Sequence, residues 1–439
     1  MPSWSNAQPV LAGEYVYACS EPTTVLCLRR SDGRVLWKRT HEYVDLLSPE
    51  KRERVQKELV AAERLRKTKL DPLRKKLQEV TRELQGLPGD PFLTKQKGSL
   101  KKLVDDLERK LVILDEYKPP RADPLIGLSN CTPVTDGQGV FVLFGNGVGA
   151  VYDLEGRRRW ARVIRRPKMP FGYSMSPVLA GRALVMSIDK EVLAIDARTG
   201  KDLWALSSYR PSAGLAATKV KEAWVVVTAE GSLISAADGR LLARVDRPAR
   251  APRCAPMVRK GMLYLLGDRQ RLLVEMLLPD RGTGVRLESA ATGSAFIGEY
   301  YASPVYHDGC VVFWEKKGIL SVVSAKDGRR LTARRIGLRG AAYASPTVAG
   351  KYLYLGTDDG TIAVLEPTIT PAADGKLTID LREVARNRLD TTRSSPVFDG
   401  NRMFLRTHKS LYCIGAKAGT DPAPADDDNP FRLGGTARP

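Results

Sequence analysis

A short phrase recurs along this chain and constrains its fold more than any other feature. Each copy has a small residue, then Ser, Thr or Ala, then Pro and an apolar residue, and it leads into a Gly turn and a strand of alternating apolar residues. The copies recur every ~40 to 50 residues, a period typical of repeat architectures. They stand at Pro9–Val10, Cys131–Val134, Met175–Val178, Ala216–Thr218 (a degenerate copy), Cys254–Met257, Ala302–Val305, Ala344–Thr347 and Ser394–Val397. The sequence therefore predicts eight similar units.

Each copy carries further turn signals that divide it into four short strands. The clearest is Val192–Trp204, where a strand, a Thr-Gly-Lys turn and a Trp-bearing strand follow one another. Four short strands per repeat are the units of a propeller, because a single small sheet exposes both faces and neighbouring blades bury them. The predicted fold is all-β, an eight-bladed β-propeller of four-stranded antiparallel blades. The eighth copy ends after its third strand, so residues 2–6 are expected to supply the closing strand.

These phrases resemble the repeat of the PQQ-like (quinoprotein dehydrogenase-like) β-propeller family. The stretch ending at Trp204 is similar to the family's repeat phrase, and the resemblance covers the chain outside one insertion and the C-terminal tail. It implies that Trp37, Trp160 and Trp204 pack between neighbouring blades. Repeats of the WD and kelch types would show Gly-His, Trp-Asp or Gly-Gly signatures, which do not recur here.

The segment from about residue 45 to 120 interrupts the first repeat and has a different character. Leu70, Leu73, Leu77, Val80 and Leu84, and then Leu100, Val104, Leu107, Leu111 and Leu114, follow the spacing of coiled-coil seams. The pattern predicts an antiparallel helical hairpin, with Pro72 kinking or interrupting its first arm. The expected divisions are 1–44 (closing strand and first blade), 45–120 (hairpin), 121–415 (remaining blades) and 416–439 (a disordered tail).

Composition and charge allow more than one class of partner and more than one cellular compartment. The net charge of +20 allows a polyanion partner, but the basic residues are scattered through the chain and do not form one arm. The six cysteines lack a C-x-x-C pair, so free thiols are expected. Only Cys19 and Cys27 are close enough within the repeat to form a disulfide, and this pairing is not favoured. No apolar run is long enough for a membrane span. No signal peptide or lipobox is visible, which favours a cytoplasmic protein as written, whereas the family resemblance implies a periplasmic or extracytoplasmic one.

The sequence offers little sign of catalytic chemistry. Common catalytic and metal motifs are missing, and His41, His307 and His408 lie in separate parts of the chain without a partner at ligand spacing. The resemblance implies that catalytic relatives hold PQQ with Ca²⁺ and that many carry adjacent cysteines. Adjacent cysteines do not occur here, and no base or metal ligands can be matched. The chain thus looks more like the non-catalytic BamB-like branch, and no cofactor is expected.

Repeat alignment also locates a candidate binding surface. The residue before each repeated phrase enters the innermost strand at the mouth of the central channel. Arginines and tyrosines there suit an acidic or planar group, or a peptide, although the same residues could instead plug the channel by bonding one another. The candidate residues are Asn130, Tyr173, Ser174, Leu215, Arg253, Glu299, Tyr300, Tyr301, Tyr343 and Arg393.

The favoured function is a non-enzymatic binding or assembly scaffold, monomeric, that contacts a protein partner through the propeller face or through the hairpin as a docking arm. Two alternatives remain open at this point. One is a PQQ-dependent dehydrogenase-like enzyme with Ca²⁺, and the other is a protein that binds nucleic acid or another polyanion.

Overall fold

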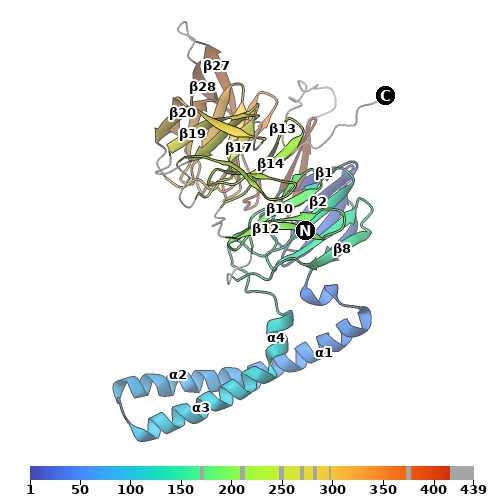
Figure 1. Ribbon diagram of the computed structural model, residues 1–439, viewed down its shortest axis with the longest axis vertical. Helices are drawn as coiled ribbons and strands as arrows, with labels where there is room; N and C mark the ends of the chain where they lie inside the picture. The colour runs from blue at the N-terminus through green and yellow to red at the C-terminus, as the bar shows by residue number, and fades with distance from the viewer. Residues whose placement is uncertain are drawn as a thin grey trace. The chain divides into compact units, whose positions relative to one another are not determined.

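The computed structural model describes residues 1–168, 173–207, 213–246, 252–266, 271–279, 284–295, 298–371 and 377–415. The chain divides into two compact units (Figure 1). Met1–Thr40 and Arg121–Pro439 form the first unit, and His41–Pro120 form the second. The sequence placed these divisions at residues 45 and 120.

Eight antiparallel sheets make up the described part of the first unit. We number these sheets, or blades, in chain order and give the strands of each from the innermost outward. The first blade has β1 (Val10–Ala12), β2 (Tyr15–Ser20), β3 (Thr24–Arg29) and β4 (Val35–Thr40); the second has β5 (Val134–Thr135), β6 (Gly139–Leu143), β7 (Val148–Asp153) and β8 (Arg158–Val163); the third has β9 (Val178–Ala180), β10 (Ala183–Ile188), β11 (Glu191–Asp196) and β12 (Asp202–Ser207); the fourth has β13 (Ala216–Val220), β14 (Ala223–Val227), β15 (Ser232–Ser235) and β16 (Leu241–Arg244). The fifth has β17 (Met257–Arg259), β18 (Met262–Leu266), β19 (Arg271–Leu278) and β20 (Arg286–Ala295); the sixth has β21 (Val305–His307), β22 (Cys310–Trp314), β23 (Ile319–Ser324) and β24 (Arg330–Arg335); the seventh has β25 (Thr347–Ala349), β26 (Tyr352–Gly356), β27 (Thr361–Pro371) and β28 (Leu377–Arg388); and the eighth has β29 (Val397–Asp399), β30 (Arg402–Arg406) and β31 (Leu411–Gly415).

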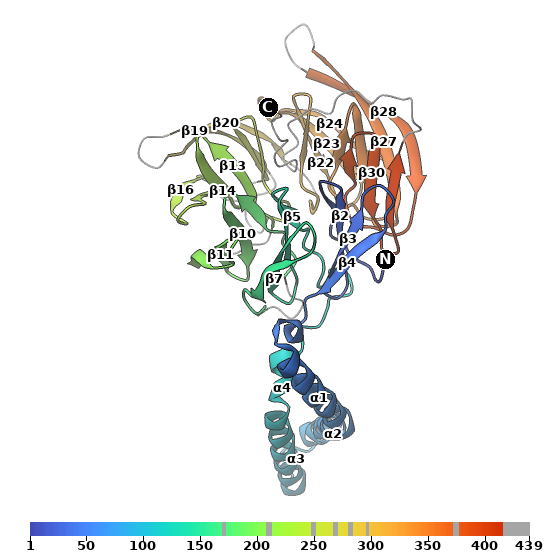
Figure 2. The same ribbon diagram turned by 90° about the vertical axis from the view of Figure 1, so that its right-hand side faces the viewer.

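The predicted propeller is confirmed. Each sheet pairs its strands in chain order, and Figure 2 shows the sheets of this unit arranged around a common centre. The middle strands of the blades are buried almost throughout, so the core consists of apolar layers between neighbouring sheets. One such layer joins Leu184 and Met186 of the third blade to Phe141 and Leu143 of the second. Burying both faces of every sheet in this way is what makes a four-stranded blade stable.

The expected closing strand at residues 2–6 is not formed. The eighth sheet has three strands in the described chain, and the first strand of the molecule begins at Val10. The backbone groups near the N-terminus are engaged by other partners. The amide of Ser3 donates to the hydroxyl of Ser20 at 2.9 Å, that hydroxyl donates back to the carbonyl of Ser3 at 3.1 Å, and the carbonyl of Trp4 accepts from the amide of Glu21. These groups therefore cannot pair with β31.

Among the described residues, the last and first blades are joined largely through side chains at their junction. Arg406 of β30 has no exposed surface, and its guanidinium donates to the backbone carbonyls of Cys19, Ser410 and Ser3. Phe404 packs beside it against the apolar face of the first blade. The burial of Arg406 lowers the pKa of its guanidinium to about 10, because a charge away from water is disfavoured.

The second unit contains the predicted helices. Its helical segments are a 3₁₀ turn (Tyr43–Leu46), α1 (Pro49–Leu65), a π-helical segment (Arg66–Leu70), α2 (Asp71–Gly86), α3 (Pro91–Lys110) and α4 (Val112–Tyr117). Pro72 lies in the first turn of α2, directly after the π-helical segment, so the arm is interrupted where the sequence predicted. The expected seams form two apolar clusters, one around Val104 and Leu70 and one around Val80 and Leu100. No described helix is both long enough and apolar enough to cross a membrane.

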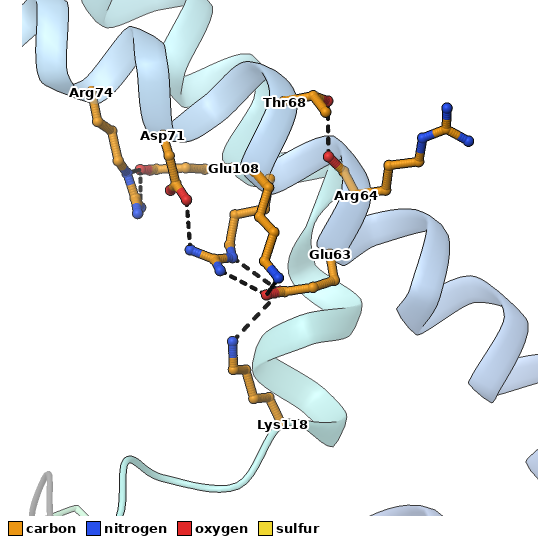
Figure 3. A network of polar contacts seen from close by, with 9 residues as sticks. Glu63, Arg64, Thr68, Asp71, Arg74, Glu108 and Lys118 are labelled. Atoms are coloured by element: carbon orange, nitrogen blue, oxygen red, sulfur yellow. Dashed lines mark hydrogen bonds and ion pairs between the residues drawn. The ribbon is translucent and has the colours of Figure 1, made fainter.

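Charged side chains support the helical unit where the π-helical segment begins (Figure 3). Arg66 bonds both carboxylate oxygens of Glu63, at 2.7 and 3.0 Å, and also reaches Asp71 at 2.8 Å. Lys118, from the other arm, lies 3.6 Å from Glu63. The hydrogen bond from Arg66, followed by the charges of Lys118 and Arg66, lowers the pKa of Glu63 to about 2. The network therefore links the two arms of the hairpin at the position of Glu63.

Candidate binding face of the propeller

Hydroxyl groups of the repeated phrase set the positions of the innermost strands. The backbone amide of Thr132 donates to the hydroxyl of Ser176 in the next blade at 2.9 Å, and the amide of Ser303 donates to the hydroxyl of Ser345 at 2.9 Å. The amide of Ser345 in turn donates to the hydroxyl of Ser395 at 2.8 Å. The Ser of these three phrases therefore anchors the preceding blade. The Pro that follows it has no amide hydrogen that would need a partner in the sheet.

A wide channel runs along these innermost strands. Its volume is about 2910 Å³. The positions that repeat alignment predicted at its mouth do line it: Asn130, Ser174, Leu215, Arg253, Tyr301, Tyr343 and Arg393. Asn130 donates from its amide nitrogen to the carbonyl of Ser174 at 3.0 Å, so these two polar groups bond each other.

On one side of the mouth, cations lie over the rings of two tyrosines. The rings of Tyr301 and Tyr343 are 5.4 Å apart between centroids. The guanidinium of Arg253 lies 5.2 Å from the Tyr301 ring, and the ammonium of Lys316 lies 5.3 Å from the same ring. Arg393 covers Tyr343 at 4.7 Å. Each contact is attractive because the ring face carries negative electrostatic potential. We call this group, with Glu299 and Asp358, the mouth cluster.

Two carboxylates hold the cations of the mouth cluster in place. Glu299 lies 2.9 Å from Lys316 and 3.6 Å from Arg253, and Asp358 lies 3.6 Å from Arg393. The hydrogen bond from Lys316 lowers the pKa of Glu299, so this carboxylate stays charged. Three cations face two carboxylates, which leaves the cluster with one net positive charge. Half of the Arg253 side chain is exposed, so it can reach a ligand from solvent.

The structure corrects part of the predicted site. Tyr173 is buried in the apolar layer between the second and third blades, and its hydroxyl donates to Asp189 at 3.2 Å, so it does not line the channel. Tyr300 is buried in the same manner in another layer. Consecutive residues of an extended chain point to opposite sides. Ser174 and Tyr301 therefore face the channel, while Tyr173 and Tyr300 face the core.

Sequence reasoning missed Lys316 and Asp358. Both follow the second strand of their blades, β22 and β26, in the turn that leads to the third strand. Aligning that turn across the repeats, as the Pro phrase was aligned, would have placed both residues at this end of the blades. The signal is weak because the turn varies in sequence from one copy to the next.

The tryptophans that were predicted to join blades each lie on a glycine of the next blade. The indole nitrogens of Trp160 and Trp204 donate to the carbonyls of Ala197 and Ala236, both at 3.0 Å. A Cβ built on Gly200 would lie 2.7 Å from the Trp160 ring. The matching distances are 2.8 Å between Gly239 and Trp204 and 2.6 Å between Gly156 and Trp37. In these three turns the Gly is thus the docking position of the preceding blade's Trp.

The two carboxylates of the mouth cluster are not arranged to hold Ca²⁺, the ion that the family resemblance associates with PQQ. Calcium takes six to eight oxygen ligands, whereas Glu299 and Asp358 are each occupied by cations. In the described parts of the chain, no three His, Cys, Asp or Glu side chains are close enough together to hold a metal ion. All six cysteines are free thiols, so the pairing of Cys19 with Cys27 is not formed.

Comparison with known proteins identifies a family and a similar fold. A family model described as outer membrane protein assembly factor BamB matches residues 188–332 and 283–425, which together are more than half of the chain. Comparison with curated protein sequences gives no match. The crystal structure of BamB from Moraxella catarrhalis superposes with a TM-score of 0.55 at 11% identity, covering 94% of this chain and 95% of that one.

Two further solved structures are more distant. The computationally designed Ika8 protein gives a TM-score of 0.44 at 13% identity, over 65% of this chain and 95% of the other. Dihydro-heme d1 dehydrogenase NirN, in complex with DHE, gives 0.41 at 14% identity, over 61% and 68% of the two chains.

Proposed function

The chain belongs to the PQQ-like β-propeller repeat family, on its BamB-like branch, and from this premise we propose that it is a binding scaffold of the assembly-factor type. In this proposal the mouth cluster contacts a protein partner and the helical hairpin serves as a docking arm. The protein acts by holding its partner, without a cofactor and without turning over a substrate. The family model's own description, an assembly factor, supports this class of role.

The observation that carries the proposal is the mouth cluster itself. Arginine and lysine side chains lie over two tyrosine rings at the opening of a channel of about 2910 Å³. Arginine and tyrosine, with tryptophan, are enriched at the energetic centres of protein interfaces. The net positive charge favours an acidic segment of the partner, and the tyrosine rings offer apolar contact area beside the charges.

The hairpin supports the proposal through the apolar side chains that it exposes. Phe92 and Leu87, in and beside the turn between α2 and α3, are 73% and 61% exposed. Val60 and Val112 on the arms are 72% and 61% exposed. Apolar residues on a stable helical pair are available for contact because the seam does not use them.

The test is recovery of partners from an extract of the source cells after chemical crosslinking. Three chains are compared with the unchanged protein: a mouth variant (Arg253→Glu with Tyr343→Ala), a chain in which a Gly-Ser linker replaces residues 45–117, and the control Arg286→Glu. Arg286 lies on β20 and is 55% exposed, so the control changes charge away from the mouth.

We expect the mouth variant to recover its main partner at least ~10-fold less, as loss of an interface centre requires. Equal recovery by all four chains would remove the proposal.

A further inference from the structure

The lining of the channel follows the register of the repeated phrase. In an extended segment every second residue points to the same side. In the sixth blade, Tyr301, Ser303 and Val305 stand around Pro304 at this spacing, and all three line the channel. The first of these positions belongs to the mouth cluster. We call the second position, taken over all blades, the hydroxyl tier, and the third the apolar tier.

The mouth cluster sets the charge at the first position. Arg253, Tyr301, Tyr343 and Arg393 occupy it in the fifth to eighth blades. The cluster carries one net positive charge, as described above, and the Arg253 side chain is half exposed. A carboxylate of a ligand is therefore favoured at this depth of the channel.

The hydroxyl tier offers hydrogen-bond donors to the channel. The hydroxyls of Ser176, Ser345 and Ser395 each accept one amide of a preceding blade, and the hydroxyl of Thr132 accepts the amide of Gln8 at 3.1 Å. A hydroxyl keeps one hydrogen to donate when it accepts a bond, and none of these four donates to another described group. The backbone carbonyls of an inserted chain are acceptors that suit them.

The apolar tier lies two residues further along each innermost strand. Six of its eight positions are apolar, and the other two are Thr218 and Thr347. All eight side chains are half-buried, so part of each faces the channel. Covering this ring with an apolar group of a ligand removes apolar surface from water. The apolar members are Val10, Val134, Val178, Met257, Val305 and Val397.

The distance between the mouth cluster and the apolar tier sets the spacing of a ligand. Tyr301 and Val305 are four residues apart, which is about 13 Å at ~3.3 Å per residue. An extended ligand chain has the same rise, so two of its residues that reach both levels are also about four apart. The channel volume of about 2910 Å³ exceeds the roughly 300–1,000 Å³ of a small-molecule site, which favours a polypeptide segment.

We propose that the channel binds an extended segment of the partner with the pattern acidic-x-x-x-apolar. The carboxylate contacts the mouth cluster, the backbone carbonyls accept from the hydroxyl tier, and the apolar side chain contacts the apolar tier. This inference rests on the proposed function and adds the chemistry and the spacing of the segment that is recognised. It depends on residues inside the channel that the proposed function does not use, so it can fail while that function stands.

The probe is the peptide Gly-Glu-Gly-Ser-Gly-Leu-Gly, labelled with a neutral dye, and its binding to the full chain is followed by fluorescence anisotropy. One control peptide has Gln in place of Glu. The other, Gly-Gly-Ser-Gly-Glu-Leu-Gly, has the same composition but places Glu directly before Leu. We expect each control to bind at least ~5-fold more weakly, because the first loses a charged hydrogen bond and the second cannot reach both levels of the channel.

A matched pair of protein variants tests the location. Thr218→Glu adds a carboxylate to the apolar tier and should weaken binding at least ~10-fold, because the incoming leucine would cover an unpaired charge. Thr332→Glu makes the same change on β24, the outermost strand of the sixth blade, and should leave binding unchanged.

A milder variant tests the hydroxyl tier without disturbing the bonds between blades. The amide of Ser303 donates to Ser345, but its hydroxyl forms no bond with a described group. Ser303→Ala therefore removes a donor of the channel alone, and we expect ~3–10-fold weaker binding of the peptide. Unchanged binding would mean that the hydroxyl tier does not contact the ligand and would contradict the proposal.

Other results would also overturn the inference. Binding that ignores the spacing of Glu and Leu is one, and no binding at ~1 mM peptide, a concentration that detects very weak complexes, is another. Partner recovery that is lost in the mouth variant but unchanged in Thr218→Glu would leave the proposed function standing and remove this inference. Peptide binding at least ~10-fold tighter after removal of residues 416–439 would make the chain's own segment the occupant in place of a partner.

Discussion

Single residues of this propeller have roles that depend on which side of a strand they occupy. The sequence located Arg253, Tyr301, Tyr343 and Arg393 at the channel because the Pro phrase marks the same register in every blade. It failed for Tyr173 because a neighbouring residue on an extended strand points to the opposite side. The family resemblance indicated the docking role of the tryptophans, but not their glycine partners, because the contact joins two different repeats.

The contribution of the Trp–Gly contact can be measured with a matched pair of glycines. Gly200 and Gly33 have φ of +69° and +72°, so Ala at either position adopts the same unfavourable backbone conformation, at about 1–2 kcal/mol. Only Gly200→Ala also forces a Cβ against an indole ring. We expect Gly200→Ala to lower the free energy of unfolding by about 1–3 kcal/mol more than Gly33→Ala, measured by urea denaturation. Equal losses would mean that the ring can move aside freely.

The hydroxyl bonds between innermost strands lead to a second expectation. Ser345→Ala removes the acceptor for the amide of Ser303 and should cost about 1 kcal/mol, since a half-buried donor is left unpaired. Ala255→Ser is the complementary change, because Ala255 stands before the Pro of a complete copy but lacks the hydroxyl, and it should leave stability unchanged or raise it by up to about 1 kcal/mol. Urea denaturation of both variants checks the pair. No loss in Ser345→Ala would indicate that water replaces the hydroxyl.

At the scale of elements, helices and strands were predictable because their periodicities are local. The leucine spacing of the hairpin located both arms, and Pro72 marked the interruption. The form of that interruption, a π-helical segment supported by Arg66 and Glu63, involves Lys118 from the far arm. A contact between residues so distant in sequence leaves no periodic signal, so it could not be predicted.

The Arg66–Glu63 network should make the stability of the helical unit depend on pH. The lowered pKa of Glu63, about 2, means that its carboxylate stabilises the folded unit above its ordinary pKa and loses this effect as the pH falls toward 2. Glu63→Gln should therefore cost up to about 1 kcal/mol at neutral pH, a modest value because the side chain is 32% exposed.

The measurement is thermal unfolding followed by far-ultraviolet circular dichroism at several pH values. The difference between Glu63→Gln and the unchanged chain should shrink in acid. Glu53→Gln is the control, since Glu53 also forms an ion pair in α1 but is 71% exposed. A difference that persists unchanged in acid would show that Glu63 acts through packing and not through its charge.

On the scale of the whole molecule, the sequence anticipated a ring but not how the ring is closed. The expected closing strand is absent, and Arg406 joins Ser3 of the N-terminal segment to Cys19 of the first blade and Ser410 of the last. A lone arginine in a strand looks like any other surface cation of this basic chain. Its burial follows from the meeting of segments some 400 residues apart, which no local pattern records.

Replacing Arg406 should destabilise the junction of the first and last blades before any other junction between blades. Arg406→Met leaves three backbone carbonyls without their donor, and each buried unpaired group costs about 1–3 kcal/mol. Relief of the buried charge offsets part of this, so we expect a net loss of about 2–4 kcal/mol on urea denaturation. Hydrogen exchange should rise first in β2 and β30. Arg388→Met, whose side chain is 68% exposed, is the control, and a gain in stability for Arg406→Met would contradict the expectation.

The side-chain closure also bears on how the molecule would respond to mechanical load. Within each blade, neighbouring strands are joined by rows of backbone hydrogen bonds, and these resist shear together. At the meeting of the first and last blades the described connections include the guanidinium of Arg406, the apolar cluster around Phe404, the Trp4–His408 ring contact and the Arg30–Asp399 ion pair at 3.0 Å, with few backbone-to-backbone bonds. Pulling on the N-terminus would break these contacts one after another. The propeller would therefore open at the junction of the first and last blades while its individual sheets are still intact.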